Sequence, residues 1–456
     1  MAAPLNTYGA MRYSTPLLDG HVMSGLIDLF IPESQESQES VIPGRVYWTQ
    51  YTAPGMPPLS GQPSQGGVAA PVEQPRQSSP TIVPFITVSE RYDSNVLLTT
   101  KKVYDYVTSI SPGARWNFQS AYMDGSVMGT MTAERYVRNP GLSYIGSSGA
   151  LSAGFDNLFG RMVGGWSVRV IDSFSYTPQQ PAFVAPEAGN QVSSAYVRGI
   201  QAYRSNSFSN VGSITSTLPI TPDTSFATTY TNQILRFFNK VDPSTSGGAL
   251  FNVDTHIISA GPQYRLSPLH TIGLTYQFQD MVFAPVAGGA PPGGITTHGG
   301  MLTWSGHLSS LFDFELGGGA SVVLPSNSLQ GTGQAMVRYT TPEMIASLTY
   351  SRGISPSFFL AGGALISDLL VASLTYNLTS KWFAIGGFNY SQSQSTEGLS
   401  LKFDSYGPTG SLNYRITPYV VASGSATYFQ MTYVSSGVST TFDRELFMLS
   451  IRAEWN

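Results

Sequence analysis

The sequence predicts an all-β protein: a transmembrane antiparallel up-and-down β-barrel of about 18 strands, preceded by an irregular N-terminal arm. Three observations carry this prediction. Apolar and polar residues alternate along much of residues 81–456, only 11% of the 456 residues are charged, and Gly and Pro, with 47 and 30 residues, mark frequent turns. No run of about 18 consecutive apolar residues occurs, so the sequence contains no candidate for a membrane-spanning helix.

The arm, residues 1–80, differs in composition from the rest of the chain. It contains the stretch SQESQESV at 34–41 and is rich in Pro, Gly, Gln and Ser at 53–80, a composition that buries too little apolar surface to form a core. We expect it to be periplasmic or luminal. One apolar island at 23–31 supplies the candidate partner-binding residues, Leu26, Ile27, Leu29 and Phe30. They either pack on the barrel's own end or bind a protein partner or a second copy of the chain.

Alternation defines the strands of the predicted barrel, residues 81–456. In residues 270–283 (HTIGLTYQFQDMVF), Ile272, Leu274 and Tyr276 share one face, and small or polar residues share the other. The same pattern recurs at 312–316, 335–340, 346–351 and 370–377, and most regularly at 447–456. Because a barrel in lipid has an apolar exterior, the apolar face is predicted to point outward. A soluble sandwich would instead show charged outer faces, which these strands almost lack.

The turns repeat as well. The motif YRLSP at 264–268 reappears as YRITP at 414–418, and Tyr339, Tyr376 and Tyr414 stand 37 and 38 residues apart, the length of one hairpin plus one connection. Long Gly, Pro and Ser segments, such as 176–191 and 285–294, lie between the short turns. Eleven strands are expected from residue 251 onward and about seven between 83 and 218, with 226–238 ambiguous. An even total of 18 is predicted, with 16 as the alternative.

The first strands resemble a known family. Residues 89–98 (SERYDSNVLL), with DYV at 105–107 and SPG at 111–113, are similar to the opening of the outer-membrane β-barrel porin family associated with exopolysaccharide export loci. Glu90, Tyr92, Asp93 and Asn95 carry the resemblance, and the YRLSP motif resembles that family's periplasmic turns. The resemblance implies an outer-membrane barrel of Gram-negative bacteria, in a family mostly without known substrates.

Seven charged residues are predicted by alternation to point inward and line a pore. They are Arg265, Asp313, Glu315, Arg338, Arg415, Arg452 and Glu454. Charges on opposing walls would create a transverse field that selects solutes weakly. Alternatively, some of them pair with neighbours within the wall.

Catalysis and metal binding find little support in the sequence. Cysteine is absent and the five histidines are scattered. His307 shares the predicted inner face with Ser305, but a solvated luminal histidine is the simpler interpretation. Asp93 and Asn95 either cap a turn or hold a calcium ion, and turn capping is favoured. We expect no enzyme activity, no cofactor and no metal.

A net charge of −4 provides no basic surface for nucleic acid, so DNA and RNA are excluded as partners. The expected partner is outer-membrane lipid. The sequence therefore predicts a passive porin or conduit for solutes or polymer. The alternative is a structural or scaffold barrel that holds a partner, or forms an array, through its arm and loops.

Overall fold

A computed structural model describes most of the chain beyond the arm. The described residues are 81–177, 206–238, 249–285, 293–357, 359–360, 363–396, 401–435 and 437–455. The expectations for residues 1–80, including those for Leu26, Ile27, Leu29 and Phe30, lie outside these ranges.

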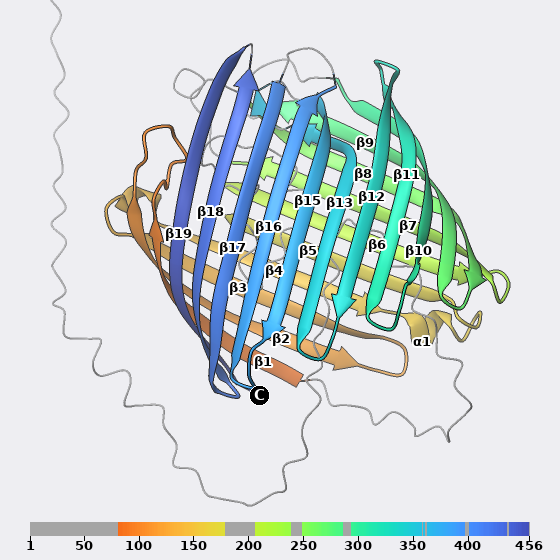
Figure 1. Cartoon of the computed structure of the whole chain (residues 1–456), viewed down its shortest axis with the longest axis horizontal. Coiled ribbons are helices and arrows are strands. Elements are labelled where there is room, and N and C mark those ends of the chain that lie inside the picture. The colour runs from red at the N-terminus through yellow and green to blue at the C-terminus, as the bar shows by residue number, and fades with distance from the viewer. Residues whose placement is uncertain are drawn as a thin grey trace, which may run out of the picture. The chain divides into compact units, whose positions relative to one another are not determined.

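The described residues form one antiparallel sheet that closes on itself (Figure 1). Its strands are β1 (Thr81–Asp93), β2 (Asp105–Gln119), β3 (Asp124–Tyr136), β4 (Tyr144–Gly154), β5 (Ser167–Thr177), β6 (Ser207–Pro219), β7 (Thr224–Phe237), β8 (Ala249–Ser267), β9 (His270–Pro285), β10 (Ile295–His307), β11 (Phe312–Leu324), β12 (Ser328–Thr340), β13 (Met344–Ser357), β15 (Gly363–Asn377), β16 (Trp382–Ser395), β17 (Leu401–Thr417), β18 (Val420–Ser435) and β19 (Val438–Glu454). The two-residue strand β14 (Phe359–Leu360) pairs with β8 and stands outside the wall order.

Each wall strand pairs with the next along the chain, and β1 pairs antiparallel with β19 to close the barrel. The predicted total of 18 strands is therefore confirmed within the described residues, and the alternative of 16 is wrong. Among the described residues before 220 there are six strands, against about seven expected, and the short helix α1 (Asp156–Phe159) follows β4. The ambiguous segment 226–238 is largely strand β7.

The two ends of the barrel differ. The first residue of β1 and the last of β19 lie at the end where connections are short, such as the two residues between β8 and β9; we call it the turn end. The opposite end, the loop end, carries the longest connections, although those between β11 and β12 and between β18 and β19 are short and the connection between β4 and β5 at the turn end is long. This arrangement follows from an even number of antiparallel strands, which returns the chain to the end where it began.

The outer face is apolar over a band bounded by aromatic rows. Leu302, Leu374 and Leu449 are 61%, 41% and 71% exposed on this face. Toward the turn end the row contains Tyr264, Trp304, Tyr376, Trp382 and Trp455. Because exposed apolar surface of this extent is stable only in contact with hydrocarbon, the barrel spans a membrane, with aromatic side chains at its interface.

A second row of outer-face tyrosines marks the other limit of the band. Tyr230, Tyr276, Tyr350 and Tyr406 make hydroxyl hydrogen bonds to His256, His298, Asp368 and Gln430, at 3.0, 2.7, 2.6 and 2.8 Å. Each tyrosine thus has its ring in the apolar band and its hydroxyl among polar side chains nearer the loop end. This amphipathic placement is typical of the boundary between hydrocarbon and water.

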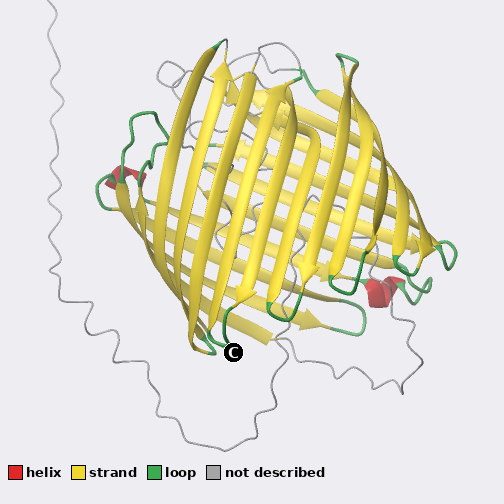
Figure 2. Ribbon diagram, viewed as in Figure 1, coloured by secondary structure: helices red, strands yellow, loops and turns green. Residues whose placement is uncertain are grey.

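Helix is scarce in the described part of the chain (Figure 2). Besides α1 it comprises only the 3₁₀ turn η1 (Pro140–Leu142). Among the described residues, no helix is long and apolar enough to cross a membrane.

The inside and outside assignment predicts opposite effects for two neighbouring residues of β15. Leu374 is on the lipid face, whereas Ser373 faces the lumen and its hydroxyl lies 2.7 Å from that of Ser347. Leu374→Arg should destabilise the barrel by ~2–4 kcal/mol, because a charge would enter hydrocarbon. Ser373→Arg should fold with little loss, since its guanidinium reaches the lumen.

The measurement is urea unfolding of both variants in lipid vesicles, with membrane assembly as a second readout. Equal stability of the two would mean that the inside and outside faces of β15 are assigned wrongly.

Candidate functional site: the barrel lumen

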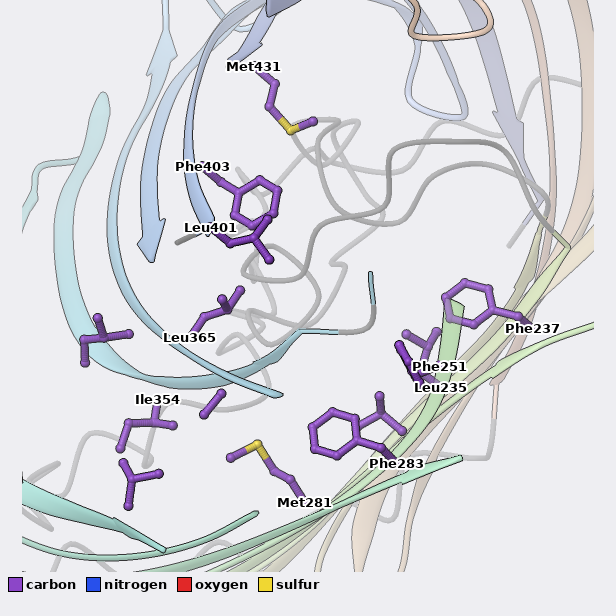
Figure 3. Close-up of a cluster of buried hydrophobic side chains, with 14 of the residues drawn as sticks. Leu235, Phe237, Phe251, Met281, Phe283, Ile354, Leu365, Leu401, Phe403 and Met431 are labelled. Carbon is purple, nitrogen blue, oxygen red and sulfur yellow. The ribbon is translucent and has the colours of Figure 1, made fainter. Parts of the chain in front are cut away.

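By alternation along their strands, the seven residues predicted to line a pore lie on the face opposite exposed apolar side chains such as Leu316, Val337 and Ile451. Figure 3 shows Leu401 and Phe403 of β17 pointing into the barrel, and Arg415 follows on the same strand at even spacing. Arg265 stands in the same relation to Phe251 of β8. Within the wall these charges fall into three groups.

The first group explains the repeated YRLSP and YRITP motifs. Both contain a β-bulge directly after the arginine, between Arg265 and Ser267 and between Arg415 and Thr417. In each case the arginine reaches the short turn next to it: Arg265 donates to the Pro222 carbonyl and lies 3.3 Å from an Asp223 carboxylate oxygen.

Arg415 repeats this arrangement on the other side of the barrel. Its guanidinium donates to the Ser380 carbonyl at 3.2 Å and lies over the ring of Phe383. The backbone N–H groups of both arginines also donate to neighbouring turns, to Asp223 and Lys381. The motif therefore ties adjacent short turns together at the inner rim of the turn end.

The second group lies on β10, β11 and β12. His307 Nδ1 lies 2.5 Å from an Asp313 carboxylate oxygen, and Asp313 stands directly opposite Arg338 in the strand ladder. Glu315, one step deeper in the lumen, accepts a hydrogen bond from the Gln334 amide.

The third group lies beside the closing pair of strands. Arg452 and Glu454 form an ion pair of 2.6 Å, and Arg115 of β2 approaches the second Glu454 oxygen at 3.9 Å. Arg452 also lies over the ring of Phe85. These contacts fit the alternative interpretation, in which the charged residues pair with neighbours within the wall.

Between the two ends, the lumen wall carries hydroxyl groups bonded to one another across strands. Examples are Thr409 with Thr427 at 2.9 Å, Thr215 with Thr229 at 3.3 Å and Ser111 with Thr132 at 3.0 Å. Because the wall satisfies these groups only in part, each hydroxyl retains capacity for water. The middle of the inner face is accordingly polar and uncharged.

Two buried ion pairs near the loop end were missed by the sequence analysis. Arg91 of β1 and Glu134 of β3 pair at 3.0 Å, and the Tyr136 hydroxyl donates to the same carboxylate. Asp93, which is fully buried, accepts hydrogen bonds from Arg444 of β19, one of them 2.9 Å long. Alternation along β1 from Phe85 places Arg91 and Asp93 on the inner face. The sequence could therefore have predicted that these two charges point inward.

The loop after β1 contains the turn-capping contact that was favoured for Asp93 and Asn95. Asp93 accepts from the Asn95 backbone N–H at 3.0 Å, and the Asn95 amide donates to the carbonyls of Thr99 and Asp443. Both side chains are thus used in holding the loop and β19. In the described ranges, no three His, Cys, Asp or Glu residues are grouped as metal ligands.

The loop end of the lumen is lined by apolar side chains, as Figure 3 shows. This apolar mouth cluster comprises Leu98, Val211, Leu235, Phe237, Phe251, Val253, Met281, Phe283, Val323, Ile354, Ala364, Leu365, Ile366, Leu401, Phe403, Phe429, Met431 and Phe442. All of them are buried. The inner face therefore changes along the barrel axis from charged, through hydroxylated, to mostly apolar, with the two buried ion pairs beside the apolar cluster.

Comparisons with known proteins find likeness in fold alone. No protein-family model matches the chain, and no curated protein matches it in sequence. A mutant of the ferric enterobactin receptor PfeA from Pseudomonas aeruginosa is 9% identical with a TM-score of 0.43, covering 83% of this chain and 81% of the receptor. OpdQ from Pseudomonas aeruginosa and OccAB3 from Acinetobacter baumannii are 9% and 10% identical, with TM-scores of 0.37 and 0.39, and each covers 82% of this chain, spanning 97% and 99% of those proteins.

The buried pair of Asp93 and Arg444 yields a test of the closing strands. Arg444→Met should destabilise the barrel by about 3–5 kcal/mol, because Asp93 would stay buried without its guanidinium partner. Adding Asp93→Asn should recover part of this loss, since the charge is then gone. Urea unfolding in detergent micelles measures both.

Lys402→Met is the matched control. Lys402 pairs with Asp404 at 3.3 Å, but this pair is on the exposed outer rim. Its loss should cost about 0–1 kcal/mol. Comparable losses for Arg444→Met and Lys402→Met would contradict a structural role for the buried pair.

Proposed function

We propose that the protein is a passive porin or conduit for solutes or polymer in a bacterial outer membrane. The observation that carries this proposal is the polar lumen inside a closed apolar shell. Over the turn end and the middle, the inner face carries charged and hydroxyl side chains, and His307 and Asp313 remain about one third exposed there. A barrel of this strand number has room for water, so a hydrated passage is the simplest use of such a wall.

The charges suggest weak rather than strict selection of solutes. One group lies on β8 and β10–β12 and the other on β17, β19 and β2, which the strand order places on opposite sides of the barrel. Each side holds both signs: Asp313 with Arg338, and Glu454 with Arg452. Since the signs largely cancel within each wall, the transverse field is modest. Arg265 and Arg415, bound to turns, contribute fixed positive charge at the rim.

The structural or scaffold barrel is the second candidate. It is favoured by the apolar mouth cluster, because a buried apolar layer at one end of the lumen opposes the flow of water and ions. Conductance distinguishes the two functions: a conduit passes current and a scaffold need not.

We further propose a periplasmic position for the arm. Residue 81 begins β1 at the turn end, and short turns face the periplasm in outer-membrane barrels. Residues 1–80 then enter from the periplasmic side, where residues 23–31 would bind a protein partner, a second copy of the chain, or the barrel's own opening.

Ion selectivity tests the conduit. Glu315→Lys changes the luminal charge by two units, so the reversal potential of the reconstituted protein in a salt gradient should shift toward anions. Asp404→Lys makes the same charge change on the outer face and should leave the reversal potential unchanged. Planar-bilayer recordings provide the measurement. Complete absence of conductance would favour the scaffold, and equal shifts in both variants would contradict a luminal pathway.

Deletion of residues 1–80 tests the arm. The barrel should remain folded, because its described strands make a closed ladder without the arm, while conductance or co-purifying proteins should change. Folding is checked by heat-modifiable gel migration. If neither conductance nor associated proteins change, the arm is a passive tail.

A further inference from the structure

The ladder between β12 and β13 stops halfway. The two strands pair from Thr340 with Ile345 as far as Gly333 with Arg352. Both strands continue toward the loop end, β12 to Ser328 and β13 to Ser357. Among the described residues, 328–332 pair only with β11 and 353–357 only with β15. We call the unpaired boundary between these two segments the seam.

Beyond the seam, the hairpin of β13 and β15 leaves the wall; we call its residues 353–357 and 363–367 the inturned hairpin. Figure 1 shows the upper end of β13 curving away from β12. At its tip, β14 pairs with β8, Phe359 opposite Leu250 and Leu360 opposite Ala249. Four wall strands, β9 to β12, separate β8 from β13. The tip therefore reaches across part of the mouth to a distant strand.

Burial on both faces of the hairpin supports this geometry. Ile354 and Ile366 stand opposite each other and, by alternation with exposed Leu348, belong to the outer face. They are nevertheless only 8% and 3% exposed and belong to the same cluster as the inner-face residue Met281 (Figure 3). Outer-face residues join an inner-face cluster only when the sheet has turned into the lumen.

The seam begins where water can reach the backbone. Tyr350, in the outer tyrosine row, bonds Asp368, which also pairs with Arg352 at 2.8 Å. Arg352 is the last β13 residue paired with β12. Unpaired backbone groups on a strand edge are destabilising in hydrocarbon, but water can hydrogen-bond them beyond the membrane. The β12 and β13 strands can therefore separate at the level of Tyr350 and toward the loop end, but not within the apolar band.

Pro356 lies in the segment of β13 that is not paired with β12. Proline cannot donate a ladder hydrogen bond, and the wall ladders are interrupted beside Pro112, Pro262 and Pro408 without a change of register, so an extended β12–β13 ladder would be weaker beside Pro356. Meanwhile β15 keeps its pairing with β16 along the hairpin, from Leu365 with Ser395 onward. The hairpin is thus attached to the wall through β16, whereas among the described residues its β13 edge has no ladder to β12.

We propose that the inturned hairpin is a two-position gate on the lumen. In the closed position, seen here, β14 is paired with β8. In the open position, the β12–β13 ladder continues in its existing register, with Thr332 opposite Gly353 and Ser328 opposite Ser357. Opening removes the hairpin from the mouth, while two backbone pairs with β8 are exchanged for pairs with β12. The role of the gate in conduction rests on the proposed conduit.

Because the chain contains no cysteine, introduced pairs can trap each position. Leu250→Cys with Phe359→Cys joins the β8 and β14 partners and locks the closed position. Leu329→Cys with Pro356→Cys joins residues that meet only when the ladder is extended, and locks the open one. Val337→Cys with Leu348→Cys joins permanently paired residues and serves as the matched control.

Each pair is oxidised in membranes, disulfide formation is scored by mass spectrometry, and conductance is recorded before and after reduction. We expect all three disulfides to form. The closed lock should abolish conductance until a reductant is added, the open lock should hold the channel conducting, and the control should have no effect.

Two results would overturn the gate. One is failure of the Leu329 and Pro356 pair to cross-link while the other two pairs do, which would show that the hairpin never reaches β12. The other is conductance that is the same in both locked variants before and after reduction. That result would support a conduit but contradict a gate. If both locks form and no variant conducts in any state, the movement of the hairpin is supported and the conduit is rejected.

Discussion

The constraint on which the rest of the structure depends is the pairing of every backbone N–H and C=O group within hydrocarbon. The β1–β19 ladder meets it by closing the sheet. Between the two aromatic rows the ladders keep one register, although they are interrupted beside Pro112, Pro262 and Pro408. The register shifts after Arg265 and Arg415 are at the turn end, and the seam starts beside the tyrosine row at the loop end. These shifts and the seam thus lie at levels at which water can satisfy the backbone.

The same two-residue period produces two very different surfaces. The outer face meets one solvent, hydrocarbon, over its whole band, so it is uniformly apolar. The inner face meets no lipid and is free to vary along the axis. It is charged at the turn end, hydroxylated in the middle and mostly apolar at the loop end, where the mouth cluster forms a core beside two buried ion pairs.

Inner-face charges follow a simple rule: the more deeply a charge is buried, the more completely it is bound. Asp93, with no exposure, is held by a guanidinium and a backbone N–H. Arg452 and Glu454, about one third exposed, need only each other and Arg115. Moving an ion out of water costs much more free energy than a solvent-exposed ion pair contributes. A buried charge therefore requires a bonded partner, whereas a charge in a hydrated lumen remains stable with weak pairing. Charges of the second kind are those able to act on a passing solute.

The sequence by itself determined the barrel class, the faces of the strands and the strand number, because alternation and turn chemistry are local properties. Leu374 and Ser373 lie on the sides that alternation assigns, and YRLSP recurs because both copies form the same bulge beside a turn. The partners of the inner charges were not predictable: Arg444 and Asp93 are 351 residues apart and meet only because the barrel closes. Ile354 and Ile366 would be assigned to the lipid face by alternation alone, yet they are buried in the mouth. Only the tertiary structure decided this. The two-residue period of a strand specifies which residues share a face. Whether that face contacts lipid, water or protein depends on the path of the sheet in space.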